Sequence, residues 1–232
     1  MMERYTQFET GEYYHVYNRG VNKYKIFFSK GDWEHFQRLL YTCNSTKSIR
    51  KASRVQGAPL DISLRGGERL VDILSYALME NHFHLLLHER QDGGISKFMS
   101  KLLTAYSMYM NKKYDRSGPL MCRPFRSRHI DSDEYLRWVI SYIHLNPIDQ
   151  IAPKWKDDGI DNLKTTEEFL KSYKYSSHQD YFPSNQGTPG DNVRQESAIL
   201  NKDALPIDIS DIDDLRGVLK EYSNKKYLDV DE

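Results

Sequence analysis

The stretch MENHFHLLLHE, residues 79–89, carries two histidines separated by one phenylalanine. Successive side chains of a β-strand point to opposite faces, so His82 and His84 share one face of a sheet while Phe83 lies on the other. The leucines at 85–87 predict a central strand that helices cover on at least one face. From the spacing alone, the two imidazoles are either ligands of a metal ion or hydrogen-bonded groups within the sheet.

The elements expected around this stretch define the fold class. The sequence predicts strands over 12–18, 70–79, 81–88 and 123–130, and helices over 31–43, 95–114, 131–147 and 211–224. Ser132 is the expected N-cap of the third helix, and Pro147 ends that helix because its ring cannot continue the hydrogen bonding. This order favours an α+β fold in which helices pack on the faces of an antiparallel sheet, with a C-terminal helical appendage.

Composition divides the chain into three expected regions. Residues 1–183 form the predicted main domain, in which 44–69, rich in Ser, Gly and cations, is an exposed basic insertion. Residues 184–206 have the composition of a linker, and 207–232 are expected to form an acidic C-terminal helix and tail that begins with a capping box at Ser210 and Asp213.

Charge is distributed unevenly although the formal net charge is zero. Residues 1–156 hold 24 Lys and Arg against 16 Asp and Glu, whereas residues 157–232 hold 9 against 17. The basic part suits a nucleic-acid partner. The chain has no N-terminal apolar segment and no apolar run near the roughly 20 residues of a spanning helix, so a soluble, cytoplasmic protein is expected. Two cysteines, Cys43 and Cys122, are too few for a disulfide framework or a thiolate cage.

A second group of polar residues lies on the helix before Pro147. Tyr142 and Asn146 are four residues apart and therefore share a helical face. If that face packs beside His82 and His84, two nitrogen ligands, one oxygen ligand and a phenol nucleophile converge, as a phosphotransfer site requires.

Other readings of these residues stay open on spacing alone. On spacing alone, a core role is the favoured interpretation of Tyr142. Tyr106 and Tyr109 on the preceding helix are rival nucleophiles, although Tyr106 falls on an apolar stripe. His144 points about 200° away from Tyr142 and is expected to form structural hydrogen bonds. His15 and His88 are not expected to be ligands.

Five motifs in this order resemble the HUH single-tyrosine transposases, and among them the REP-associated tyrosine transposases. They are YHVYNRG (14–20), ALMENHFHLLL (77–87), SGPLMCRPFRS (117–127), YIHLNP (142–147) and YKYSSHQDY (173–181). The resemblance covers most of residues 13–181 and implies a ferredoxin-like two-layer sandwich. It also implies that His82, His84 and Asn146 bind a divalent metal and that Tyr142 is the nucleophile.

The resemblance further implies cleavage and rejoining of single-stranded DNA beside hairpins through a 5′-phosphotyrosine. Two imidazoles and an amide oxygen form a mixed ligand set that suits Mg²⁺ or Mn²⁺. The candidate DNA contacts are Arg19, Lys112, Lys113, Arg123, Arg126 and Arg128. Two alternatives stay open: a domesticated hairpin-binding protein without strand transfer, and a metal-dependent hydrolase of an unrelated substrate. The sequence leaves open whether the protein is a monomer or a homodimer.

Overall fold

A four-stranded antiparallel sheet forms the centre of the protein. The computed structural model describes residues 7–48, 66–182, 194–209 and 215–222. The strands are β1 (Tyr13–Arg19), β2 (Val71–Met79), β3 (His82–Glu89) and β4 (Arg126–Ile130). Their order in the sheet is β2-β3-β1-β4, and every neighbouring pair is antiparallel. The predicted antiparallel sheet is therefore confirmed, with β4 starting three residues later than expected.

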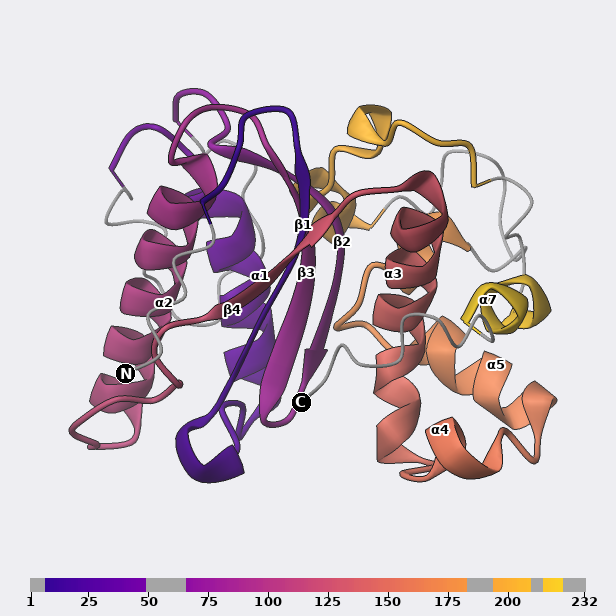
Figure 1. Ribbon diagram of the computed structural model, residues 1–232. Coiled ribbons are helices and arrows are strands. Elements are labelled where there is room, and N and C mark those ends of the chain that lie inside the picture. The colour runs from indigo at the N-terminus through magenta and orange to yellow at the C-terminus, as the bar shows by residue number, and fades with distance from the viewer. Residues whose placement is uncertain (1–6, 49–65, 183–193, 210–214, 223–232) are drawn as a thin grey trace.

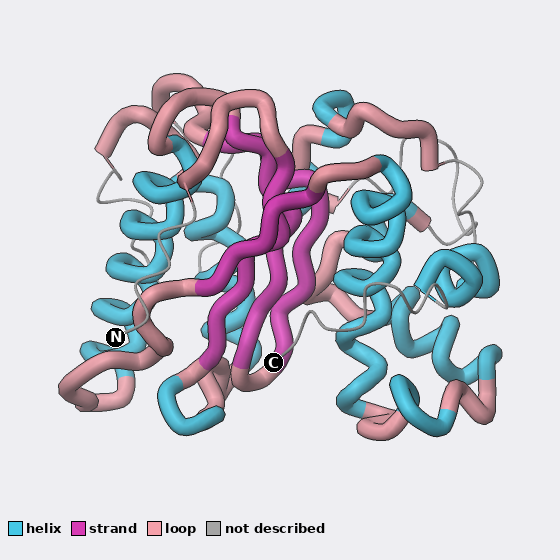
Figure 2. The backbone as a smooth tube through the Cα atoms, in the orientation of Figure 1, coloured by secondary structure: helices cyan, strands magenta, loops and turns pink. Residues whose placement is uncertain are grey.

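Helices cover both faces of this sheet, which gives three layers instead of the two that the resemblance implied. Helices α1 (Lys30–Cys43) and α2 (Gly94–Lys113) lie on one face (Figure 1). On the other face lie α3 (Asp133–Leu145), α4 (Trp155–Asp158), α5 (Leu163–Ser172) and α7 (Leu215–Tyr222), as the tube in Figure 2 also shows. A further short helix, α6, spans His178–Tyr181. The predicted packing of helices on the faces of the sheet is confirmed.

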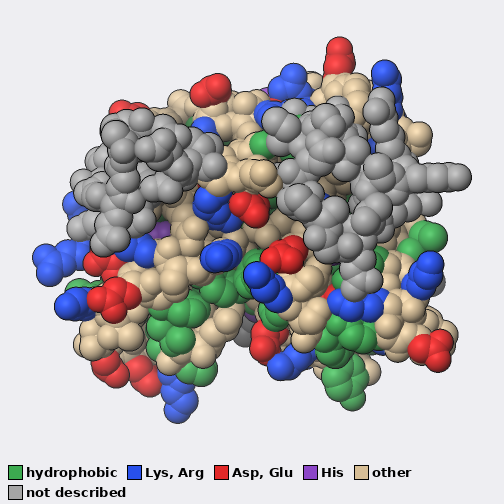
Figure 3. Space-filling view, turned by 180° about the vertical axis from the view of Figure 1, so that it is seen from behind, with side chains coloured by type: hydrophobic (Ala, Val, Ile, Leu, Met, Phe, Trp, Pro, Cys, Tyr) green, Lys and Arg blue, Asp and Glu red, His purple; other side chains and the backbone are tan. Residues whose placement is uncertain are grey.

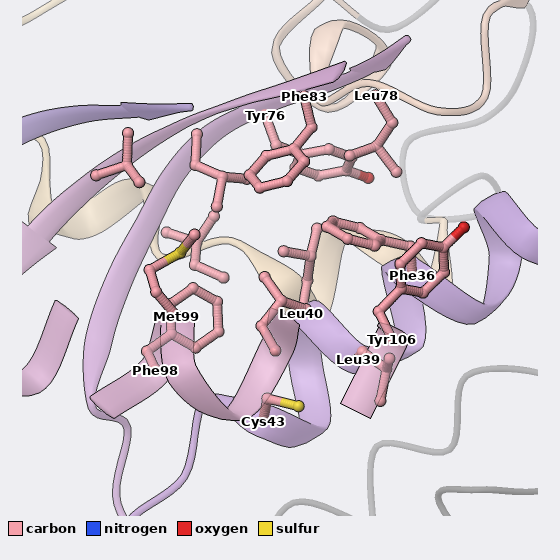
Figure 4. Packing of buried hydrophobic residues seen from close by; sticks show 14 of the residues in the cluster. Phe36, Leu39, Leu40, Cys43, Tyr76, Leu78, Phe83, Phe98, Met99 and Tyr106 are labelled. Atoms are coloured by element: carbon pink, nitrogen blue, oxygen red, sulfur yellow. The ribbon is translucent and has the colours of Figure 1, made fainter. Parts of the chain in front are cut away.

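Two hydrophobic cores result, one on each face of the sheet. In the core on the α1–α2 face, the α1 side chains of Phe36 and Leu40 pack beneath Phe83 of β3 (Figure 4). Against α3, Leu86 of β3 joins Trp138 in the second core. The alternation along β3 therefore divides its apolar residues between the cores and leaves the histidine face toward α3.

The helix α3 has the expected boundaries for local reasons. The Ser132 hydroxyl accepts a hydrogen bond from the backbone N–H of Tyr135, which satisfies one of the unpaired donors of the first turn. Acidic Asp133 and Glu134 stand in the first turn, where the helix dipole favours negative charge. After Leu145 the chain tightens into a 3₁₀ helix, Asn146–Gln150, that accommodates Pro147 near its start. Asn146 therefore lies where α3 ends and the 3₁₀ helix begins.

The C-terminal part of the chain is more closely packed than the expected linker. Residues 194–206 contain two 3₁₀ helices, Gln195–Ile199 and Lys202–Ala204, and the buried side chains of Ile199 and Leu200 join the core beneath α1 and α2. These apolar residues account for the difference, because burial of their side chains stabilises an ordered path. The remaining linker residues 184–193, the capping box at Ser210 and Asp213, and the tail 223–232 lie outside the described residues, as do 49–65 of the basic insertion.

One face of the protein is mixed in charge. On the face drawn in Figure 3, Lys and Arg side chains lie interspersed with Asp and Glu side chains and form no field of one sign. Within the described part of the chain, no helix combines the length and apolar character needed to cross a bilayer.

Candidate active site

Strand register gathers polar side chains beside the two histidines. In the β1–β3 pair, Arg19 lies opposite His82 and Tyr17 lies opposite His84. In the β1–β4 pair, Arg126 lies opposite Tyr17. Residues directly opposite one another point to the same face of a sheet. Two guanidinium groups therefore flank the histidines on the face that α3 covers.

Tyr142 of α3 packs directly against the histidine face. Its ring lies 5.3 Å from the His84 ring, centroid to centroid and at 90°, and 5.7 Å from the ring of His15. Its other neighbours are Trp138, whose ring stacks at 5.0 Å, and Tyr222 of α7, whose ring stacks at 6.2 Å. The side chain is only 2% exposed. The expected convergence of Tyr142 and the histidine strand is thus present, but under a cover of aromatic side chains.

The side-chain oxygen of Asn146 is buried without a hydrogen-bond partner among the described residues. Nδ2 of the same amide donates a 2.8 Å hydrogen bond to the backbone carbonyl of Tyr142, so Oδ1 is the remaining polar atom. An unsatisfied buried carbonyl oxygen is costly unless a ligand completes it. Asn146 therefore fits the role of an oxygen ligand.

The chemistry of the donor set also fits a divalent ion. Burial lowers the pKa of His84 well below its ordinary value, and the nearby charges of His15 and His82 lower it further. A neutral imidazole is the form that binds metal. No cluster of three His, Cys, Asp or Glu side chains suited to a metal is found in the described residues, so the candidate set is two imidazoles and an amide oxygen.

A pocket of about 280 Å³ opens beside the histidines. It is lined by Tyr17, Asn18, Arg19, Lys23, Asn81, His82, His84, Cys122, Pro124, Arg126, Asp149 and Lys156. Four of these side chains are cationic and one is a carboxylate. The ammonium of Lys156 lies 5.1 Å from the centroid of the Tyr142 ring, so one cation borders both the pocket and the tyrosine. The lining suits a phosphodiester, whose oxygens accept hydrogen bonds and carry negative charge.

The six candidate DNA contacts occupy three different places. Arg19 and Arg126 line the pocket. Arg123 and Arg128 are exposed beside it on the β4 segment, and the guanidinium of Arg128 lies over the Tyr135 ring. Lys112 is exposed on α2, across the sheet from the histidine face.

Lys113 of α2 has a partner inside the protein. Its ammonium lies 2.6 Å from the carboxylate of Asp32, which is fully buried, and it also contacts the hydroxyls of Ser29 and Tyr109. This lysine therefore compensates a buried charge of α1.

The rival tyrosines, His144 and His88 have structural hydrogen bonds. The hydroxyl of Tyr106, which is fully buried on the α1–α2 side, donates to the carbonyl of Ile26 at 2.7 Å. The hydroxyl of Tyr109 donates to Asp32 at 2.8 Å. Nε2 of His144 pairs with the hydroxyls of Ser75 and Ser177, and Nδ1 of His88 lies 2.9 Å from Asp72. The expectation of a core role for Tyr106 and a structural role for His144 is confirmed.

Three residues that line the pocket, Lys23, Asn81 and Lys156, were not singled out from the sequence, and His15 was named only as a residue not expected to be a ligand. His15 and Asn81 belong to quoted motifs, and Asn81 directly precedes His82, so their positions carried a signal. Lys156 lies ten residues beyond Asn146, after a 3₁₀ helix and a turn, and no periodic pattern predicts that its side chain returns to the tyrosine.

No curated protein matches the chain. A solved structure described as "Structure of the REP associates tyrosine transposase bound to a REP hairpin" is similar, with a TM-score of 0.48 and 11% sequence identity, over 78% of this chain and 85% of that chain. Residues 66–146 match the family model described as "Transposase IS200 like", and this segment holds His82, His84, Tyr142 and Asn146. The resemblance to single-tyrosine transposases that the motifs indicate is therefore confirmed over residues 66–146.

Proposed function

We propose that the protein is a metal-dependent transposase that cleaves and rejoins single-stranded DNA beside hairpins, with Tyr142 as the nucleophile. The observation that carries the proposal is the contact of Tyr142 with His84, because it unites a nucleophile and a metal-ligand type from distant parts of the chain. The match of residues 66–146 to IS200-like transposases supports the same assignment.

The DNA backbone is the part of the substrate that the pocket fits best. Arg19, Arg126 and Lys156 offer charge-assisted hydrogen bonds to non-bridging phosphate oxygens. Contacts of this kind position a strand without reading its sequence, so hairpin selection requires further contacts. Two exposed arginines, Arg128 on β4 and Arg123 in the segment before it, extend the basic surface beyond the pocket.

His82, His84 and Asn146 would hold Mg²⁺ or Mn²⁺ in this proposal. Such an ion, when bound, would supply Lewis-acid stabilisation of the negative charge that develops on the scissile phosphate. His84 supplies a neutral nitrogen donor, because burial lowers its pKa, and Asn146 supplies an oxygen that has no hydrogen-bond partner among the described residues. Nitrogen donors favour Mn²⁺, while availability in the cell favours Mg²⁺.

Tyr142 performs the covalent step. Its phenol oxygen loses a proton and forms a bond to phosphorus while the bond from phosphorus to the 3′ oxygen breaks, and the leaving oxygen takes up a proton. The products are a 5′-phosphotyrosine and a free 3′-hydroxyl. One phosphoester replaces another, so attack by a 3′-hydroxyl on the phosphotyrosine reverses the step without a nucleotide cofactor. The ammonium of Lys156 lies over the Tyr142 ring, 5.1 Å from its centroid, so one cation stands beside the proposed nucleophile.

In the described structure, neighbouring aromatic side chains block the access of DNA to Tyr142. The side chain is 2% exposed, and Tyr222 of α7 stacks over Trp138 and Tyr142. A phosphate must approach the phenol oxygen to within about 3.5 Å for attack. Cleavage therefore requires α7 or its terminal tyrosine to move away.

The test is covalent capture. The full-length protein is incubated with Mn²⁺ and single-stranded hairpin oligonucleotides labelled at the 3′ end, and the products are resolved in SDS. We expect a labelled protein band for wild type and for Tyr109→Phe, and no band for Tyr142→Phe or with EDTA. A band that persists in Tyr142→Phe would overturn the assignment of the nucleophile.

Burial of Tyr142 favours one alternative, a hairpin-binding protein that does not cut DNA. In that case wild type and Tyr142→Phe bind the labelled hairpins equally in a gel-shift measurement, and neither forms the SDS-resistant band even after residues 207–232 are removed. Appearance of the band on removal of the tail would exclude this alternative.

A further inference from the structure

Both histidines of the site have a hydrogen-bond partner at the same ring atom. Nδ1 of His82 lies 2.6 Å from Oδ1 of Asn81, and Nδ1 of His84 lies 2.8 Å from Nε2 of His15. In a neutral imidazole one nitrogen carries the proton and the other has the lone pair that binds a metal. The partner at Nδ1 therefore decides whether Nε2 can be a ligand.

At His82 the direction of the hydrogen bond follows from the orientation of Asn81. Nδ2 of Asn81 donates to the carbonyl of Lys23 at 3.2 Å, and the backbone carbonyl of Asn81 accepts from the backbone N–H of Gly20 at 2.8 Å. These contacts fix the amide so that Oδ1 points to the imidazole. Because an amide oxygen only accepts, Nδ1 of His82 carries the proton, and Nε2 is left unprotonated.

At His84 the partner is another imidazole. His15 is fully buried, and its ring stacks on those of His84 and Tyr17, with centroids 5.0 Å apart in both cases. Packing on both strands thus fixes the ring of His15. When Nε2 of His15 accepts, Nδ1 of His84 carries the proton, and its Nε2 has the same unprotonated state as that of His82.

We propose that Asn81 and His15 are positioning residues that hold His82 and His84 in the tautomer protonated at Nδ1, so that both Nε2 atoms offer a lone pair to a divalent ion. This inference rests on the proposed function, since it assigns the ligand atoms of the same metal site. Partners of ligating histidines commonly change metal affinity by about 10–100-fold when they are removed.

The direct test is the tautomer itself, measured on the full-length, metal-free protein by long-range ¹H–¹⁵N correlation of the imidazole rings. We expect proton-bearing Nδ1 and unprotonated Nε2 for both His82 and His84, assigned with His82→Gln and His84→Gln. A protonated Nε2 on either ring would overturn the proposal for that residue, whether or not the protein binds metal.

The second readout is the affinity for Mn²⁺, measured by electron paramagnetic resonance on variants of His15 and Asn81. His15→Phe fills the space without an acceptor, whereas His15→Gln places an amide oxygen near the position of Nε2. Asn81→Leu and Asn81→Asp form the matching pair. We expect about 10–100-fold weaker binding for the first member of each pair and recovery to within a few-fold in the second.

The two readouts separate the inference from the function on which it rests. Equal Mn²⁺ affinity in wild type and all four variants would overturn the positioning role. Absence of any Mn²⁺ binding by wild type, with both Nδ1 atoms protonated, would overturn the proposed metal-dependent function while supporting the fixed tautomers. If His15→Phe does not fold, the Asn81 pair and the wild-type spectrum still decide the outcome.

Discussion

The ring of Tyr142 stands perpendicular to the ring of His84, with the centroids 5.3 Å apart. The contact joins β3 to α3 across the second core. These two elements are far apart in the sequence, because α2 and β4 lie between them along the chain. Local geometry orients each partner. Alternation along β3 directs His84 toward α3. The N-cap at Ser132 fixes where α3 begins, and therefore which of its residues, including Tyr142 in the third turn, face the sheet.

Replacing Asn146 with leucine is expected to abolish stabilisation by metal while leaving the metal-free protein intact. Leucine removes a buried oxygen that has no partner among the described residues, which offsets the loss of the hydrogen bond from Nδ2 to Tyr142. Thermal unfolding in EDTA should give a melting temperature close to that of wild type. Added Mn²⁺ should raise the melting temperature of wild type but not of Asn146→Leu.

The control for this measurement is Asn111→Leu. Oδ1 of Asn111, on α2, is likewise buried without a partner among the described residues, but it belongs to the opposite face of the sheet. This variant should keep the full response to Mn²⁺. A full response in Asn146→Leu as well would exclude Asn146 as a ligand.

Replacing Tyr222 with alanine is expected to increase the rate of covalent adduct formation. The tyrosine ring stacks on Trp138 and Tyr142, so its removal uncovers the nucleophile. Phe182→Ala is the matched control, because Phe182 is also 8% exposed in the same core but packs against His144. Initial rates of the SDS-resistant band should rise in Tyr222→Ala alone. An equal rise in both variants would indicate general loosening of the core instead of uncovering.

Much of this site could be predicted from the sequence because it depends on local periodicity. The alternation His82, Phe83, His84 places the histidines on one face in any register of the strand, and a spacing of four residues places Tyr142 above Asn146 on any α-helix. The boundaries of α1, β3 and α3 follow from caps, turns and Pro147, all of which are visible in the sequence.

The remainder depends on tertiary contacts that no local pattern encodes. The hydrogen bond between His15 and His84 joins two strands whose register only the folded sheet defines. Lys113 has the appearance of a surface cation on α2, but its charge is paired with buried Asp32 of α1. Ile199 and Leu200 lie in a polar stretch whose composition suggests a linker. They are buried because they pack into the core against α1 and α2, a contact that only the folded structure defines.

Lys156→Ala and Arg126→Ala are expected to weaken binding of single-stranded hairpin DNA and to reduce its salt dependence. Both side chains line the pocket. Each lost phosphate contact should lower the slope of log affinity against log salt concentration by about 0.7 for a single strand. Fluorescence anisotropy across a salt series measures the slope. Lys97→Ala on α2, an exposed lysine across the sheet, should leave it unchanged. Equal slopes in all the proteins would exclude the pocket as the DNA site.

Asp32→Asn is expected to destabilise the protein at neutral pH and to lose that effect in acid. Burial raises the pKa of Asp32, but hydrogen bonds from Lys113, the hydroxyls of Tyr114 and Tyr109, and the Phe28 N–H outweigh it and lower the pKa to about 2. A carboxylate with a lowered pKa stabilises the fold above its ordinary value of 3.8, and this contribution disappears as the pH falls toward 2. Nearly two pKa units correspond to about 2.5 kcal/mol.

Denaturant unfolding at several pH values checks this sign. The free energy of unfolding of Asp32→Asn should lie about 2–3 kcal/mol below that of wild type at pH 7, and the gap should close between about pH 4 and pH 2 because wild type loses its carboxylate there. Glu34→Gln on the same helix removes a carboxylate that is 42% exposed and paired with Lys30 at 3.4 Å, so it should change stability by at most about 0.5 kcal/mol. A gap that stays constant down to pH 2 would show that the substitution acts by perturbing packing, and that the charge of Asp32 is not what stabilises the α1–α2 contact.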